Sequence, residues 1–138
     1  MEEALKVFYE RMTATQQGDT ASLLRKLAVM EEGHKAKLRD TYLRITDSRD
    51  TSDLEKEAQG AKIMEGGFTM EESLKANLPN TPADVITKAM MFEAQALDLY
   101  LRYSRKIKDT RSADILISLA DDEKNHLSLL GGMMEKTV

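Results

Sequence analysis

The sequence predicts an all-α fold, a four-helix bundle with one long crossover between its second and third helices. Four segments carry apolar residues at three- and four-residue spacing, which is the pattern of amphipathic helices. Short polar turns join the first segment to the second and the third to the fourth, so each pair is expected to be antiparallel. Residues 47–80 separate the two pairs and are long enough to run back along the bundle.

The first helix is expected at residues 1–16 and the second at about 20–46, with a turn at Gly18-Asp19-Thr20. Residues three or four positions apart lie on one face of a helix, so the apolar stripes predict which side faces the core. The stripe of the first helix comprises Glu2, Leu5, Tyr9 and Met12, and that of the second comprises Leu24, Leu27, Glu31, His34, Leu38 and Ile45.

The third helix is expected at about 82–107 and the fourth at about 111–134, with Lys108-Asp109-Thr110 as the turn between them. Thr81 before Pro82 is a strong helix start, because Thr caps the free backbone N–H groups and Pro fits the first turn. The third stripe comprises Ile86, Ala89, Glu93, Ala96 or Leu97, Tyr100 and Ile107, and the fourth comprises Leu116, Leu119, Glu123, His126, Leu130 and Met133.

A length of 138 residues suits one domain, residues 1–138, with a single core. No segment approaches the roughly 18 apolar residues of a membrane span and no signal peptide is visible, so no membrane is expected and the cytoplasm is the default location. A net charge of −4 argues against a nucleic-acid partner. The lack of cysteine excludes disulfides, iron–sulfur clusters and cysteine-based zinc sites.

The functional prediction starts from a repeated pair of glutamate and histidine. The chain has two histidines, His34 and His126, and a glutamate stands three residues before each, Glu31 and Glu123. Three residues are nearly one helical turn, so the members of each pair point the same way. Glu-x-x-His on two helices is the pattern that builds carboxylate-bridged two-metal sites in four-helix bundles.

The pattern extends into the helix before each pair. Glu2 and Glu93 precede the two histidines by 32 and 33 residues, and a tyrosine follows each of them after seven residues, Tyr9 or Tyr100. The chain is therefore interpreted as a duplication of one unit, a helix with Glu and Tyr followed by a helix with Glu-x-x-His.

These positions predict a metal site, because four carboxylates in one dry core repel one another and are costly to desolvate. No Lys or Arg lies on the stripes near them, so two divalent cations are expected to supply the compensating charge. The predicted ligands are Glu2, Glu31, His34, Glu93, Glu123 and His126. Carboxylate and imidazole donors suit iron or manganese and also accept zinc. The alternatives are solvated Glu-x-x-His pairs, or a bundle that keeps the fold without the metal.

Within this set Glu31 and Glu123 are assigned as bridging ligands, whereas Glu2 and Glu93 are assigned as mainly terminal ones. Tyr9 and Tyr100 lie two turns from the terminal glutamates on the same faces. Each tyrosine can therefore hydrogen-bond a ligand carboxylate from a neighbouring helix. The alternative for both is a half-buried core tyrosine whose hydroxyl finds another partner. No catalytic residue separate from the metal site is predicted.

With these residues the chain resembles the rubrerythrin family of the ferritin-like superfamily. The resemblance covers about residues 1–46 and 82–134, and residues 93–100 and 122–126 look especially like the rubrerythrin-type domains that follow rhodanese-like domains. It implies a ferritin-like bundle, a di-iron site, a homodimer and reduction of hydrogen peroxide. Because Glu2 stands at the very start of its helix, further helix upstream is also expected in the native protein.

Two departures from the family modify these expectations. The family's rubredoxin iron site needs four cysteines and this chain has none, so the electrons are expected from an external donor. The family's extra glutamate, one turn after the third-helix ligand, is replaced by Ala96. The resemblance thus implies a rubrerythrin-like oxidoreductase that reduces peroxide or dioxygen. The alternatives are iron binding with ferroxidase activity, or a non-enzymatic metal-binding module that accompanies a rhodanese-like partner.

Overall fold

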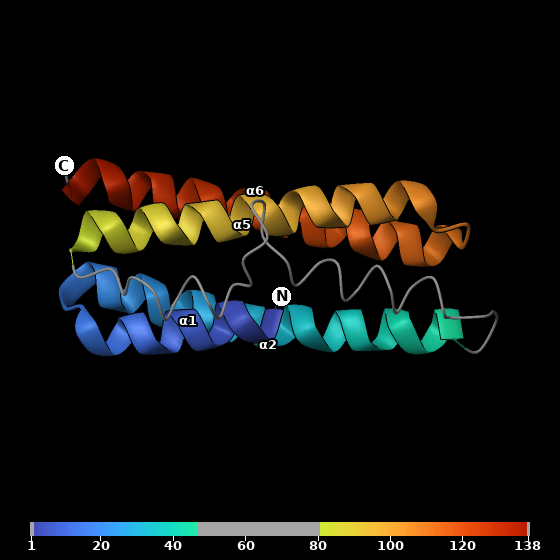
Figure 1. The fold of residues 1–138 in the computed structure, drawn as a ribbon, viewed down its shortest axis with the longest axis horizontal. Helices are drawn as coiled ribbons and strands as arrows, with labels where there is room; N and C mark the ends of the chain where they lie inside the picture. Colours follow the sequence, from blue (N-terminus) through green and yellow to red (C-terminus); the bar gives the residue numbers. More distant parts are fainter. Residues whose placement is uncertain (1, 47–80, 138) are drawn as a thin grey trace, which may run out of the picture.

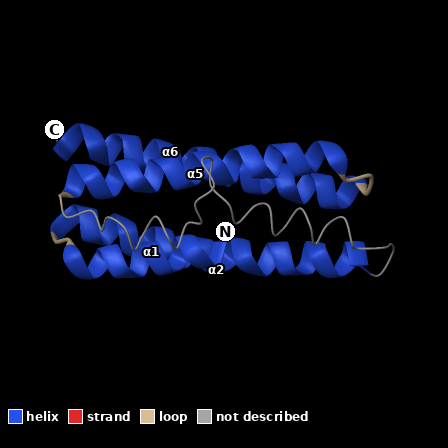
Figure 2. Cartoon of the chain, in the orientation of Figure 1, coloured by secondary structure: helices blue, strands red, loops and turns tan. Residues whose placement is uncertain are grey.

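The computed structural model describes residues 2–46 and 81–137, apart from the side chains of Glu2, Tyr42 and residues 44–46. The described residues fold into helices without any strand (Figure 2). The helices are α1 (Glu2–Thr15), α2 (Gly18–Thr46), α5 (Pro82–Lys106) and α6 (Thr110–Thr137). The predicted all-α four-helix bundle is confirmed.

The bundle consists of two antiparallel hairpins that lie side by side, α1 with α2 and α5 with α6 (Figure 1). Between the hairpins, α2 faces α6 and α1 faces α5. Helices α2 and α5 start at the same end of the bundle (Figure 1). The predicted long crossover falls on residues 47–80, which lie outside the described residues.

Local sequence signals account for the helix starts. The Thr81 hydroxyl accepts a hydrogen bond from the Asp84 N–H at 3.1 Å, so the predicted cap of α5 is present. The Asp109 carboxylate caps α6 by accepting from the Ser112 N–H at 3.2 Å. The predicted turn at residues 18–20 is wrong by two residues, because α2 already begins at Gly18. Gly18 has a φ of 62°, which lets the chain reverse over fewer residues than expected.

The core follows the predicted stripes. Fully buried members include Leu5, Tyr9, Leu24, Leu27, Ile86, Ala89, Leu119 and Leu130. Phe8 of α1 and Phe92 of α5 join the hairpins edge to face, with ring centroids 5.3 Å apart. Within the described ranges, none of the helices has both the length and the apolar composition required to cross a bilayer. Next to this apolar core the bundle buries a group of charged residues.

Candidate metal centre

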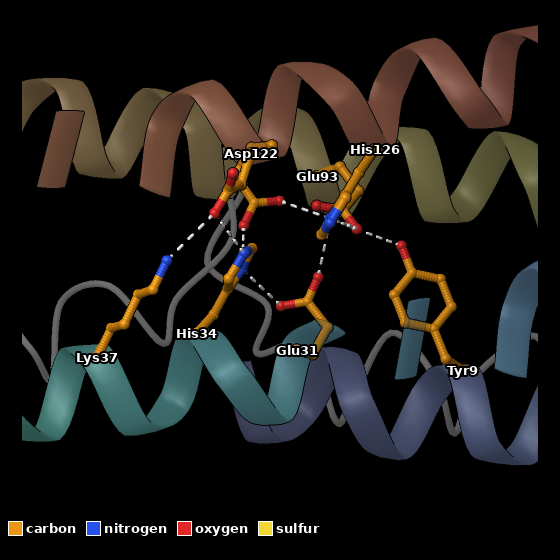
Figure 3. Close-up of polar contacts among 8 residues, drawn as sticks. Tyr9, Glu31, His34, Lys37, Glu93, Asp122 and His126 are labelled. Carbon is orange, nitrogen blue, oxygen red and sulfur yellow. Dashed lines mark hydrogen bonds and ion pairs between the residues drawn. The ribbon is translucent and has the colours of Figure 1, made fainter. Parts of the chain in front are cut away.

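Glutamates and histidines from two helices meet in the middle of the bundle. Glu31 and His34 come from α2, and Glu123 and His126 come from α6. All four side chains are buried, and each offers a ligand atom that lies within 4.8 Å of the other three ligand atoms. The Glu-x-x-His spacing places both members of a pair on the inner face of one helix. The group thus joins one hairpin to the other across the bundle (Figure 3).

Each glutamate of this group contacts both histidines. Glu31 lies 3.4 Å from His34 Nδ1 and 3.2 Å from His126 Nδ1. Glu123 lies 2.9 Å from His34 Nδ1 and 3.4 Å from His126 Nδ1. The imidazole rings stack with centroids 5.1 Å apart and planes 11° apart. Both Nδ1 atoms therefore face the same two carboxylates.

Glu93 of α5 extends the group on the His126 side. Its Oε1 accepts hydrogen bonds from the Tyr9 hydroxyl and from His126 Nδ1, the latter at 3.2 Å. Both Glu93 and Tyr9 are fully buried. The structure thus places Tyr9 against a predicted ligand carboxylate from a neighbouring helix (Figure 3).

The other two predicted residues are not joined to the group by the described contacts. The Glu2 side chain lies outside the described residues, although its backbone belongs to α1. The Tyr100 hydroxyl is buried and has no hydrogen-bond partner among the described residues. The expected hydrogen bond from Tyr100 to a ligand carboxylate is therefore absent from the described part of the chain.

The buried charges are not balanced by basic side chains. Among the described residues, no Lys or Arg is buried, whereas Glu31, Glu93 and Glu123 are fully buried. Burial by itself lowers the pKa of His126, but its attraction to the nearby carboxylates of Glu123 and Glu31 outweighs this effect and raises the pKa to about 9. A protonated His126 supplies one positive charge beside three buried carboxyl groups.

The hydrogen-bonding capacity of the group is also insufficient. His126 Nδ1 has oxygens of three carboxylates within 3.4 Å, and one N–H cannot satisfy all of them. Both Glu123 oxygens and Glu93 Oε2 are buried and accept no hydrogen bond from any described residue. A metal cation removes both deficits at once, because it accepts several oxygen and nitrogen donors and carries positive charge. Such donors suit iron, manganese or zinc, so the residues present fit a metal site.

Comparison with known proteins adds no relative to this picture. No family model, curated protein or solved structure matches this chain. What the centre can do chemically follows from its own residues.

Asp122 also contacts the centre, although it is not among the residues predicted from the sequence. Asp122 Oδ2 lies 3.2 Å from His34 Nε2 and 3.7 Å from Lys37 Nζ. The contact joins α6 to α2 across 88 positions of sequence, so no local pattern signals it. Its position directly before Glu123 is the one available hint, because a carboxylate beside a ligand is well placed to support another ligand.

We expect Tyr9→Phe to destabilise the metal-free protein by about 1–3 kcal/mol, because Glu93 loses a buried hydrogen-bond donor. Urea denaturation of chelator-treated protein measures the change. Tyr100→Phe is the matched control, since its hydroxyl has no hydrogen-bond partner among the described residues, and we expect a change near zero. Equal losses in the two variants would show that the Tyr9 hydroxyl has no special role.

Proposed function

We propose that the buried group is a two-metal carboxylate centre, with iron as the functional metal. The observation that supports this most is that Glu31 and Glu123 each contact both histidines. A carboxylate between two imidazoles is placed to bridge two ions, with one histidine on each. Manganese and zinc can occupy the same donors, because oxygen and imidazole ligands do not select strongly among these metals.

The contacts and the sequence repeat together suggest the division of roles. Glu93 contacts His126 and is proposed as the terminal ligand on that side. Glu2 occupies the matching position of the other repeat and is proposed as the terminal ligand beside His34. Glu31 and Glu123 are the bridges. The Tyr9 hydroxyl donates to Glu93 and so holds that carboxylate in place.

The proposed reaction is the reduction of hydrogen peroxide. Two ferrous ions bound in the centre would supply two electrons, so that one H₂O₂ and two protons give two water molecules. The chain contributes a dry, buried setting in which the ligands hold their places without competition from solvent. An external electron donor must restore the reduced form, because the chain has no cysteine for an iron–sulfur centre of its own.

The resemblance to rubrerythrin-type domains supports this reaction and also a homodimer. The lack of cysteine favours a second candidate, the binding and oxidation of ferrous iron without dedicated electron return. In that case dioxygen or peroxide is the oxidant and iron is the substrate. An accessory role beside a rhodanese-like partner is the third candidate.

The test is to measure metal content and the rate of oxidation in protein loaded with ferrous iron. We expect two irons per chain, and oxidation by peroxide that is faster than oxidation by dioxygen in stopped-flow absorption. Repeated reduction by a reductase and reoxidation without loss of iron would favour peroxide reduction. Release of iron after each oxidation would favour the second candidate. Equal rates with the two oxidants would remove the basis for a peroxidase.

A further inference from the structure

One member of the buried centre lies close to the protein surface. His34 is 4% exposed, whereas the other described members of the centre are at most 1% exposed. Asp122 Oδ2 lies 3.2 Å from His34 Nε2, and the side chain of Asp122 is 37% exposed (Figure 3). Among the described residues, this is the one place where a carboxylate that reaches solvent also contacts the centre.

Along the bundle axis the centre is closed by leucines. Leu27 and Leu130 lie one helical turn from the centre towards one end of the bundle, and Leu38 and Leu119 lie one turn from it towards the other end. Three of them are fully buried, and Leu38 is partly buried against the core. A divalent cation on such a path would give up its water without receiving a ligand, which is very costly. The apolar layers therefore block entry along the axis.

The position equivalent to Asp122 in the other hairpin carries no carboxylate. Asp122 directly precedes Glu123 in α6, and Met30 directly precedes Glu31 in α2. Met30 is partly buried and packs against the apolar core. A thioether is a weak and soft donor, so it does not attract a hydrated divalent cation as a carboxylate does. The described residues therefore provide a charged link between solvent and the centre on the His34 side alone.

A lysine lies on the solvent side of Asp122. Lys37 Nζ is 3.7 Å from Asp122 Oδ2, and the side chain of Lys37 is 52% exposed. An ion pair of this length between exposed side chains contributes little to stability, so an arriving cation can displace the ammonium group. Lys37 also repels a cation that approaches Asp122. The ammonium group thus occupies the place beside Asp122 that an arriving metal ion would take.

We propose that Asp122 is the entry point through which a divalent cation passes from solvent to the buried centre, between α2 and α6. Its carboxylate attracts the hydrated ion, replaces part of its water and passes it to the donors around His34. Release follows the same path in the reverse direction. This inference rests on the proposed two-metal centre, but it concerns the rates of metal binding rather than the set of ligands.

The test measures the rates of cobalt(II) uptake and release by the chelator-treated full chain in stopped-flow absorption. We expect Asp122→Asn to slow uptake by about tenfold, because the charge that attracts the ion is lost. Release to an excess of EDTA should not become faster, because the same step slows the ion in both directions. Lys37→Gln should accelerate uptake, because it removes the competing ammonium group and its repulsion.

Asp121→Asn is the matched control, because it removes the same charge from the neighbouring residue, whose side chain is 66% exposed and pairs with Lys124. It should leave both rates unchanged, and circular dichroism verifies that each variant is folded. Unchanged uptake in Asp122→Asn would overturn the inference and leave the metal centre standing. If release alone became faster, Asp122 would only support His34. Equal slowing of uptake in Asp121→Asn would also overturn the inference, because the overall surface charge would then explain the rate. No binding of cobalt at all would overturn the metal centre itself.

Discussion

Glu123→Ala is expected to bind at least one metal ion fewer per chain than the unmodified protein. Glu123 lies between the two histidines, 2.9 Å from one Nδ1 and 3.4 Å from the other, and is proposed to bridge both ions. Its loss removes a donor and a negative charge from both positions. His126→Ala is expected to have an effect at least as large on its own side. Elemental analysis of protein purified from iron-replete cells measures the outcome.

Two further variants separate this effect from simple loss of fold. Asp121→Ala changes an exposed carboxylate two residues away and should keep the full metal content. Glu123→Gln keeps the volume of the side chain and removes its charge, and both Glu123 oxygens lack a hydrogen bond from the described part of the chain. We therefore expect Glu123→Gln to lose metal while the chain stays folded, as circular dichroism would show. Full metal content in Glu123→Ala would contradict the proposed ligand set.

Removal of the metal is expected to make the stability of the protein depend on pH above neutrality. In the metal-free protein the pKa of His126 is raised from 6.5 to about 9, so the folded state holds a proton that the unfolded state releases. The stabilisation is complete below pH 6.5 and is lost as pH rises through 9. Its size is on the order of 3 kcal/mol, from the size of the pKa shift.

Urea denaturation of chelator-treated protein between pH 6 and pH 10 measures this loss. The metal-loaded protein should not show it, because a metal ion on His126 replaces the proton, and metal binding itself should strengthen with pH. His126→Gln is the control that cannot titrate, and its metal-free form should lack the decline between pH 6.5 and 9. A metal-free protein with constant stability over this range would show that His126 is not held protonated by Glu31 and Glu123.

The helices could be predicted from the sequence because apolar spacing and helix caps are local sequence signals. Apolar spacing located α1 at 1–16 against an observed Glu2–Thr15, and Thr81 with Pro82 fixed the start of α5 to the residue. The start of α2 was less predictable, since Gly18 can either prolong a turn or complete it within one residue through a positive φ. The end of α6 was placed at 134 and lies at Thr137, because a polar last turn lacks the spacing that marks the core-facing face.

The sequence predicted the part of the centre for which helical spacing determines the direction of the side chains. Glu-x-x-His twice, inside apolar stripes, brought Glu31, His34, Glu123 and His126 together as the structure shows. Asp122 was missed because its partner, His34, lies on another helix. The apolar stripe of a helix does not determine how α6 is rotated relative to α2, so it does not show which residues at the edge of the stripe meet. The same reason applies to the Tyr9 hydroxyl, whose acceptor on α5 could be named only as one of several neighbouring carboxylates.

The two hairpins contribute equivalent halves of the centre, and this arrangement bears on how such a site can change over time. A site formed by two identical chains must carry the same residue on both sides of its axis, so any substitution appears twice. Joining the halves in one chain removes that obligation. Met30 and Asp122 are related by the same offset of 92 residues as His34 and His126, so they occupy equivalent positions of the two halves. The two residues differ, which two identical chains could not achieve. In the proposed two-metal centre a single chain could thus give the two ions separate tasks without rebuilding the bundle around them.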